Sequence, residues 1–237
     1  MGKRIISQAR GHGGPRYRVR RKAFLHRIQY PMANGDGEVL KLINSRGHSA
    51  PLAKIIIGER IFYNVAAEGM YEGQKINIGK DSGVGSVLLL KEIPTKTPVY
   101  NIEINPNDGG KLIRAGGSSA IIIKKERGKV TILLPSKKEK VFNEMCRATI
   151  GVAAGSGRHE KPIVKAGKMF YIKRTKSKLW PRTSAVKMNV IDHPFGSGRG
   201  KNLAHGNLGK IPKRNAPPGA KVGSVRAKRT GRKKGSK

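Results

Sequence analysis

The stretch PLAKIIIGERIFYNVA, residues 51–66, indicates the fold class of this chain. It contains two runs rich in Ile, Val, Phe and Tyr on either side of Gly58, and such runs between turn-forming residues are typical of short β-strands. Similar runs lie on both sides, so we expect strands at residues 38–43, 51–57, 60–66, 75–78 and 86–91. Five short strands separated by Gly, Asn and Asp predict a small closed barrel of the OB type over residues 36–92. The exposed strands of such a barrel would face its ligand.

A second set of short β-type runs follows the hinge Ile93-Pro94-Thr95. We expect strands at residues 99–104, 120–124, 130–134, 140–142 and 147–150. They predict a second small β-barrel over residues 93–160. The first two of these strands are joined by a long loop that contains Asn105-Pro106-Asn107-Asp108-Gly109-Gly110-Lys111 and Arg114-Ala115-Gly116-Gly117. A long loop with this many turn formers and interspersed cations is more often functional than a simple connection.

The charge of the chain is large and unevenly placed. The formal net charge is +36, from 50 Lys and Arg against 14 Asp and Glu. Residues 36–160 hold 19 basic and 13 acidic side chains, whereas the rest of the chain holds 31 basic and one acidic. A charge of this size exceeds what solubility needs and points to a polyanionic partner, most simply a nucleic acid. We therefore expect a basic N-terminal extension over residues 1–35 and a basic, Gly/Pro-rich C-terminal extension over residues 161–237.

Each extension leaves two interpretations open. Residues 1–35 contain no acid and could be a disordered tail or an arm that folds against phosphates, and the composition favours the arm. Between residues 151 and 187, Phe170, Tyr171 and Trp180 stand among cations. These rings could stack on unpaired bases or could pin the segment to the second barrel. A short helix around residues 163–167 is predicted there, and no independent fold is expected after Phe195.

The stretch MNVIDHPFGSGRG, residues 188–200, lies where the foldable part of the chain gives way to a cationic ribbon, because Asp192 is the last acidic residue. Its glycines would allow close backbone approach. His193 is the one candidate for chemistry, since imidazole titrates near neutrality and the adjacent Asp192 could orient the ring or hold a cation. The alternative is that His193 holds the loop by hydrogen bonding to RNA or backbone. We favour this positioning role over proton transfer.

Other sites and locations are excluded by the distribution of residues. The histidines are scattered and Cys146 is the only cysteine, so neither a zinc site nor any other metal site is expected. The run Gly196-Ser197-Gly198-Arg199-Gly200 lacks the Gly-Lys-Ser/Thr ending of a phosphate-binding loop, and no cofactor is expected. The first 30 residues carry nine basic residues and no apolar run, and no apolar run approaches the length that spans a membrane. These features predict a cytoplasmic protein without a membrane partner.

Seven short motifs carry a more specific signal. They are Asn107-Asp108-Gly109-Gly110-Lys111-Leu112, Cys146-Arg147-Ala148-Thr149-Ile150-Gly151, Trp180-Pro181, Met188-Asn189, Asp192-His193-Pro194-Phe195-Gly196, Arg214-Asn215-Ala216-Pro217-Pro218-Gly219 and Lys228-Arg229-Thr230-Gly231-Arg232. Together they closely resemble the archaeal members of the uL2 family of ribosomal proteins, formerly L2, and the resemblance runs nearly from end to end.

The resemblance implies a mainly β architecture in which an OB-fold is followed by an SH3-like barrel, with extended basic arms that penetrate large-subunit rRNA. It also implies contacts with other ribosomal proteins and roles in subunit association, in tRNA binding and in organising the peptidyl transferase centre, where RNA carries out the chemistry. The residues that we expect to bind rRNA are Arg16, Arg18, Arg20, Arg21, Lys111, Arg114, Arg147, Lys178, Trp180, Arg182, Asn189, Asp192, His193, Gly196, Gly198, Arg199, Arg214, Lys228, Arg229 and Arg232.

The chain departs from the family pattern at three places. Ser184-Ala185 stands where relatives usually have Arg-Gly, Val190 replaces a usual proline, and Gly200-Lys201-Asn202 stands where archaeal relatives often carry His-Gln-His. Arg182 or Lys187 could supply the missing cation.

Two other function classes fit a strongly basic chain. A DNA-compacting protein would be expected to show repeated motifs or a recognition helix, and the sequence has neither. An RNA-acting enzyme that uses His193 would lose its activity, but keep its RNA affinity, when this histidine is replaced by alanine.

Overall fold

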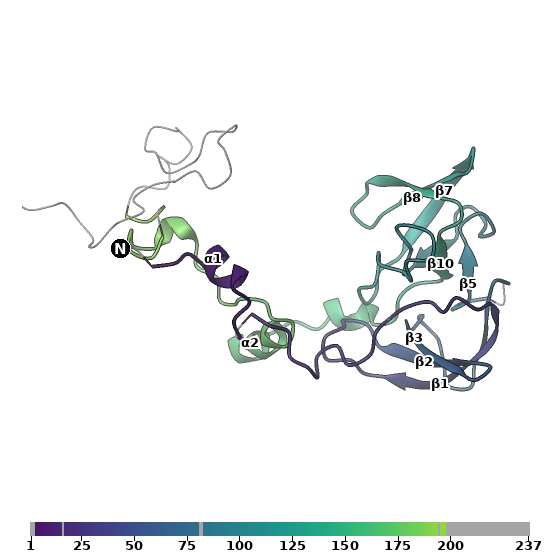
Figure 1. Ribbon diagram of the computed structural model, residues 1–237, viewed down its shortest axis with the longest axis horizontal. Helices are drawn as coiled ribbons and strands as arrows, with labels where there is room; N and C mark the ends of the chain where they lie inside the picture. Colours follow the sequence, from purple (N-terminus) through teal and green to yellow (C-terminus); the bar gives the residue numbers. More distant parts are fainter. Residues whose placement is uncertain (1–2, 16, 81–82, 194, 198–237) are drawn as a thin grey trace, which may run out of the picture. The chain divides into compact units, whose positions relative to one another are not determined.

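The computed structural model describes residues 3–15, 17–80, 83–193 and 195–197 (Figure 1). The chain forms two compact units. One, here called the β unit, is Val19–Met169, and the other, here called the arm unit, combines Met1–Arg18 with Phe170–Lys237. The predicted residues from position 198 onward lie outside the described part.

The β unit is built from short strands joined by turns. The strands are β1 (Gly35–Ile43), β2 (Leu52–Ile57), β3 (Arg60–Val65), β4 (Lys75–Ile78), β5 (Val87–Leu89), β6 (Pro98–Tyr100), β7 (Ala120–Glu126), β8 (Lys129–Leu133), β9 (Glu139–Asn143) and β10 (Arg147–Ile150). Among the described residues they form one sheet in the order β3-β2-β1-β4-β5-β10-β6-β7-β8-β9. The mainly β fold predicted from the sequence is confirmed, and it is consistent with an OB-fold followed by an SH3-like barrel.

The sheet encloses two hydrophobic cores, one at each end of the β unit. Figure 1 shows β1, β2 and β3 side by side, β7 and β8 at the other end, and β5 and β10 between them. The first core contains Leu52 and Ile55, and the second contains Ile122 and Ile132, all of them fully buried. Strand β10 joins the two halves because it pairs with β5 on one side and with β6 on the other.

Two predicted strands end two or more residues earlier than expected, and in both the backbone turns early. The strand predicted at residues 99–104 ends at Tyr100 because Asn101 adopts a positive φ of 49°, which a continuing strand does not allow. The strand predicted at residues 86–91 ends at Leu89, where the amide of Glu92 donates a turn hydrogen bond to the carbonyl of Leu89.

The β unit also takes in residues on both sides of the predicted barrels. Ile28 and Tyr30 are buried in the first core, and so is Ala153, which pairs with Ala67 in an isolated bridge. The Tyr30 hydroxyl lies 2.7 Å from the Asn101 carbonyl oxygen and 2.6 Å from Thr149 Oγ1. Apolar side chains at alternating positions therefore anchor the C-terminal end of the N-terminal extension in the core. The extension as a whole still has the composition of a basic arm.

Helices are few in the described part of the chain. Helix α2 (Ala166–Thr175) begins later than the helix predicted at residues 163–167 and runs through the aromatic residues, and it buries no side chain. The boundary between the two units falls within α2. The arm unit contains α1 (Ile6–Gly11) and the 3-10 turn η2 (Ala185–Lys187), and a further 3-10 turn, η1 (Ser156–His159), belongs to the β unit. Among the residues described, none of the helices has both the length and the apolar character that crossing a bilayer requires.

Candidate nucleic-acid interface

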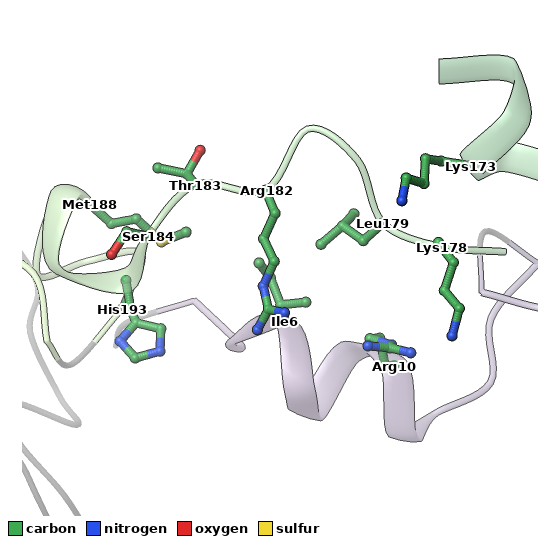
Figure 2. A pocket seen from close by; sticks show the side chains of 11 residues that line it. Ile6, Arg10, Lys173, Lys178, Leu179, Arg182, Thr183, Ser184, Met188 and His193 are labelled. Carbon is green, nitrogen blue, oxygen red and sulfur yellow. The ribbon is translucent and has the colours of Figure 1, made fainter. Parts of the chain in front are cut away.

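The arm unit contains a cleft of about 700 Å³, here called the basic cleft because its lining includes four Lys and Arg side chains. Its lining residues are Ile6, Arg10, Lys173, Lys178, Leu179, Arg182, Thr183, Ser184, Ala185, Met188 and His193. Figure 2 shows the side chains of Lys178 and Arg182 extending toward α1, which carries Ile6 and Arg10, and the side chain of Lys173 entering from α2. None of the described residues that line this cleft is acidic. Four guanidinium and ammonium groups thus converge without a protein counter-ion in the lining.

Backbone and side-chain hydrogen bonds hold together the segments that form the basic cleft. The Lys3 amide donates to the Ile191 carbonyl at 2.9 Å, and Lys3 Nζ lies 2.8 Å from Asp192 Oδ1. This hydrogen bond and the Asp192 charge raise the pKa of Lys3 above its ordinary value. On the other side, Ser177 Oγ donates to the Arg18 carbonyl at 2.6 Å. The N-terminal segment and residues 177–192 are therefore joined at two points, with the cleft between them.

The loop around His193 is organised by its own backbone. The amides of Asp192 and His193 both donate to the Asn189 carbonyl, at 3.0 and 3.1 Å. The Phe195 amide donates to His193 Nδ1 at 3.1 Å, so Nδ1 is an acceptor and the neutral ring carries its proton on Nε2. Of the two possibilities that the sequence left open for Asp192, the structure shows the second, because its carboxylate pairs with the Lys3 ammonium and the His193 ring is held by its own loop.

Gly196 closes this loop. It is buried, and a Cβ at this position would collide with the backbone of Asn189 and with the Met188 carbonyl oxygen. The Gly196 amide donates to the His193 carbonyl, and the Ser197 amide donates to the Met188 carbonyl. The absence of a Cβ at Gly196 thus allows the backbone of this loop to pack against itself. Gly198, which we also expected to allow close backbone approach, lies outside the described residues.

Two predicted cations of the long loop in the β unit line a second cavity, of about 520 Å³. Lys111 Nζ lies 3.3 Å from Asp108 Oδ2, and its side chain is 55% exposed. The guanidinium of Arg114 donates to the carbonyls of Gly110 at 3.3 Å and Ile28 at 3.4 Å. Burial lowers the pKa of the Arg114 guanidinium below its ordinary value. Arg114 therefore ties the loop to the N-terminal segment while one side of the cavity remains basic.

Arg147 has a different environment from the other predicted binding residues. Its side chain is 8% exposed, and Nε and Nη2 donate to Glu103 Oε1 at 3.2 and 3.0 Å. Nη1 donates to the Pro31 carbonyl at 2.6 Å, and the guanidinium lies 5.4 Å from the centre of the Tyr30 ring. The structure places this charge in a buried ion pair that joins the N-terminal segment to β10.

The structure places the remaining predicted residues as follows. Arg18, Arg20 and Arg21 are exposed, as is Asn189, and Trp180 is half-buried. Arg16, Gly198, Arg199, Arg214, Lys228, Arg229 and Arg232 lie outside the described residues. Of the predicted set, Lys178, Arg182 and His193 thus share the basic cleft, and Lys111 and Arg114 share the cavity of the β unit.

The prediction missed two kinds of residue. Arg10 and Lys173 line the basic cleft, and Phe24, His26 and His48 line the cavity of the β unit. An aromatic residue and a histidine close together at positions 24 and 26, next to cations, were a signal that could have been used. Nothing in the sequence distinguished Arg10 from its basic neighbours.

The aromatic residues of α2 lie at the surface. Phe170 and Tyr171 are 40% and 66% exposed, and Arg174 lies 5.9 Å from the centre of the Phe170 ring. In the described ranges, no group of three or more His, Cys, Asp or Glu side chains could hold a metal ion.

Comparison with known proteins assigns the family. Residues 83–218 match the model of the C-terminal domain of ribosomal proteins L2. The chain is 44% identical to a protein named large ribosomal subunit protein uL2 from Methanococcus maripaludis strain C5, over 98% of this chain and all of the relative. Proteins with the same name from Korarchaeum cryptofilum and Hyperthermus butylicus are 44% and 45% identical, over 99% of this chain and 97% and 100% of their own lengths. The chain therefore belongs to the uL2 family of ribosomal proteins.

Proposed function

We propose that this protein is a structural component of the large ribosomal subunit that binds large-subunit rRNA in the cytoplasm. The names of its relatives support assembly into that subunit. The observation that carries rRNA binding is the basic cleft, in which Arg10, Lys173, Lys178 and Arg182 converge with no acid in the lining. Like charges held together in this way repel each other, and a polyanion between them removes the repulsion.

The charge balance of the described residues supports the same proposal. Only four ion pairs occur within these residues, and one of them, between Arg147 and Glu103, is buried. Most of the 50 basic side chains are therefore not neutralised by protein carboxylates, of which the sequence has only 14. Lys and Arg that contact phosphate release condensed counter-ions, which drives binding and makes it depend on salt.

The finer roles that we propose are contacts with other ribosomal proteins, support of subunit association and tRNA binding, and organisation of the peptidyl transferase centre. For His193 we propose positioning rather than proton transfer. Its Nδ1 accepts a backbone hydrogen bond, so the neutral ring has Nε2–H to offer as a donor. An imidazole held by its own loop is suited to fix the position of an RNA group.

The first test is co-sedimentation of the tagged protein with large subunits in cell extracts. A quantitative test replaces Arg10, Lys178 and Arg182 together by alanine and measures rRNA binding as log K against log salt. Loss of three phosphate contacts should reduce the slope by about 2 to 3. The matched control is Lys75→Ala, an exposed lysine that faces Glu38 across the β1–β4 pair, and this variant should keep the slope.

The results also separate the alternatives. An unchanged slope in the triple variant would refute the role of the basic cleft. Equal affinity for duplex DNA and rRNA at the same salt, together with absence from large subunits, would favour a DNA-compacting protein. Turnover of RNA by the protein outside the ribosome, abolished in His193→Ala, would favour an enzyme.

A further inference from the structure

The second cavity belongs to the β unit and combines aromatic rings with cations. It is here called the aromatic groove, and its lining residues are Phe24, His26, Arg27, Ile28, Gln29, His48, Asp108, Gly110, Lys111 and Arg114. They come from the N-terminal segment, from the loop between β1 and β2 and from the loop between β6 and β7. Its volume of about 520 Å³ lies in the range of sites that hold small ligands.

The ring of Phe24 is held in place although the residue is 44% exposed. It meets the ring of His48 edge-on, with the ring centres 4.8 Å apart, and His48 Nδ1 lies 2.7 Å from Ser45 Oγ. Gly47 donates its amide to the Ala23 carbonyl at 2.7 Å, and a Cβ on Gly47 would come within 2.8 Å of the Phe24 ring. The local fold thus keeps an apolar ring at the surface in a defined orientation, at the cost of leaving it exposed to water.

A second ring pair lies beside it. His26 stacks on Tyr63 with the ring centres 4.2 Å apart and an angle of 30° between the planes. Tyr63 lies on β3, and Ile28 forms a parallel bridge with it, so the N-terminal segment covers the edge of the sheet at this point. The His26 ring, which lines the groove, is therefore backed by a ring on β3.

The cations of the groove leave it positive. Arg27 is exposed, and Lys111 and Arg114 face the groove from the long loop. The one carboxylate, Asp108, is already satisfied, because it accepts the amides of Ile104, Asn105 and Gly110 and pairs with Lys111. Its charge is spread over these donors, which weakens its repulsion of a phosphate.

We propose that the aromatic groove binds one unpaired nucleotide of RNA, with its base stacked on Phe24 and its phosphate at Arg27 and Lys111. Exposed rings next to cations are the combination that binds single-stranded nucleotides. A base inside a duplex has both faces covered by its neighbours, so only an extruded nucleotide can offer a face to the ring. This inference rests on the proposed rRNA binding and names the part of the RNA that the β unit recognises.

The test uses the full chain and two RNA hairpins of equal length that differ in one bulged nucleotide, replaced by 2-aminopurine for fluorescence. The wild-type protein should bind the bulged RNA more tightly than the paired one and should quench the fluorescence. Phe24→Leu keeps an apolar side chain without a π-face and should lose about tenfold in affinity for the bulged RNA only, with loss of quenching. Phe24→Tyr should restore both.

Two controls distinguish the proposal from a general loss of structure. Tyr71→Leu removes another exposed ring of the β unit, one that lies near Glu68 and Glu72 in the sequence, and it should leave binding unchanged. The urea midpoint of Phe24→Leu should match that of Phe24→Tyr if the loss is one of stacking.

Each remaining outcome refutes a stated idea. Equal binding of bulged and paired RNA by wild type and Phe24→Leu would refute the nucleotide site but leave rRNA binding intact. Competition by free AMP at the same concentration as the bulged RNA would show a mononucleotide site and refute the RNA assignment. If the wild-type protein bound neither of the hairpins and did not bind rRNA, both the proposed function and this inference would be refuted.

Discussion

Replacement of Glu103 by glutamine should destabilise the β unit more than any other single loss of charge in the described residues. Glu103 is fully buried and accepts five hydrogen bonds. Oε2 accepts the amides of Asn107 and Arg147, at 3.2 and 2.8 Å, and Oε1 accepts the Gly109 amide together with two guanidinium nitrogens of Arg147. The carboxylate thus joins the long loop to β10.

The magnitude follows from this geometry. Glutamine has one acceptor oxygen and one amide nitrogen, so either orientation turns a donor toward at least two buried donors. Each unsatisfied buried donor costs about 1 to 3 kcal/mol, and loss of one partner of a buried ion pair costs about 3 to 5 kcal/mol. These ranges describe the same loss and are not additive, so the free energy of unfolding should fall by about 3 to 5 kcal/mol.

The assay is urea unfolding of the full chain at neutral pH, followed by far-UV circular dichroism, with the midpoint and slope compared between variants. Glu126→Gln is the matched control, because Glu126 is 63% exposed in its ion pair with Lys124 and should cost less than about 1 kcal/mol. In the double variant Glu103→Gln and Arg147→Met, part of the lost stability should return, since no unpaired charge remains buried. Equal effects of Glu103→Gln and Glu126→Gln would refute the argument.

Three further results are expected. Gly110→Ala should lower the thermal unfolding temperature more than Gly73→Ala does. The two φ angles are similar, at +83° and +86°, but only a Cβ on Gly110 meets another atom, Asn101 Oδ1 at 2.5 Å. Equal effects would show that backbone strain alone decides the loss. Burial opposes ionisation of Asp108, but hydrogen bonds from backbone amides and from Lys111 outweigh burial and lower the pKa of Asp108 below the ordinary 3.8. The ionised carboxylate should therefore contribute its full stabilisation above pH 3.8, and this contribution should decline as the pH falls through the folded-state pKa. Acid titration of Asp108→Asn should lack this decline, and an unchanged titration curve would contradict the assignment. Burial, and secondarily the Glu103 charge, raise the pKa of the Cys146 thiol to about 11. At pH 8, iodoacetamide should therefore label this buried thiol only when the protein unfolds. Labelling of the native wild type at the rate of a free thiol would refute this expectation.

The sequence predicted the strands well where the signal was local. Residues 75–78 and 147–150 carry compact apolar runs between turn formers, and these ranges are the observed β4 and β10. The pairing of β10 with both β5 and β6 could not be predicted, because such pairing depends on packing between distant segments and not on periodicity. The early end of β6 depends on the positive φ of Asn101, which the apolar pattern around it conceals.

The candidate site was likewise predictable from local sequence only in part. Charge alone indicated that the extensions are basic and that a polyanion is the partner, and Lys178 and Arg182 do share a cleft. Charge could not show that Arg147 is neutralised, because its partner Glu103 is 44 positions away in the sequence. The aromatic groove escaped prediction for a related reason, since Phe24 and His48 belong to segments that meet only in the folded chain.

The central position of β10 also bears on how the protein is made. The first core needs Ala153, and β5 gains its second neighbour only when β10 is present. Translation proceeds at about 5 to 20 residues per second, so the roughly sixty residues between β5 and β10 take about 3 to 12 s to emerge. During this interval the first half of the β unit has an open sheet edge at β5, and this edge is exposed to pairing with another chain until β10 emerges.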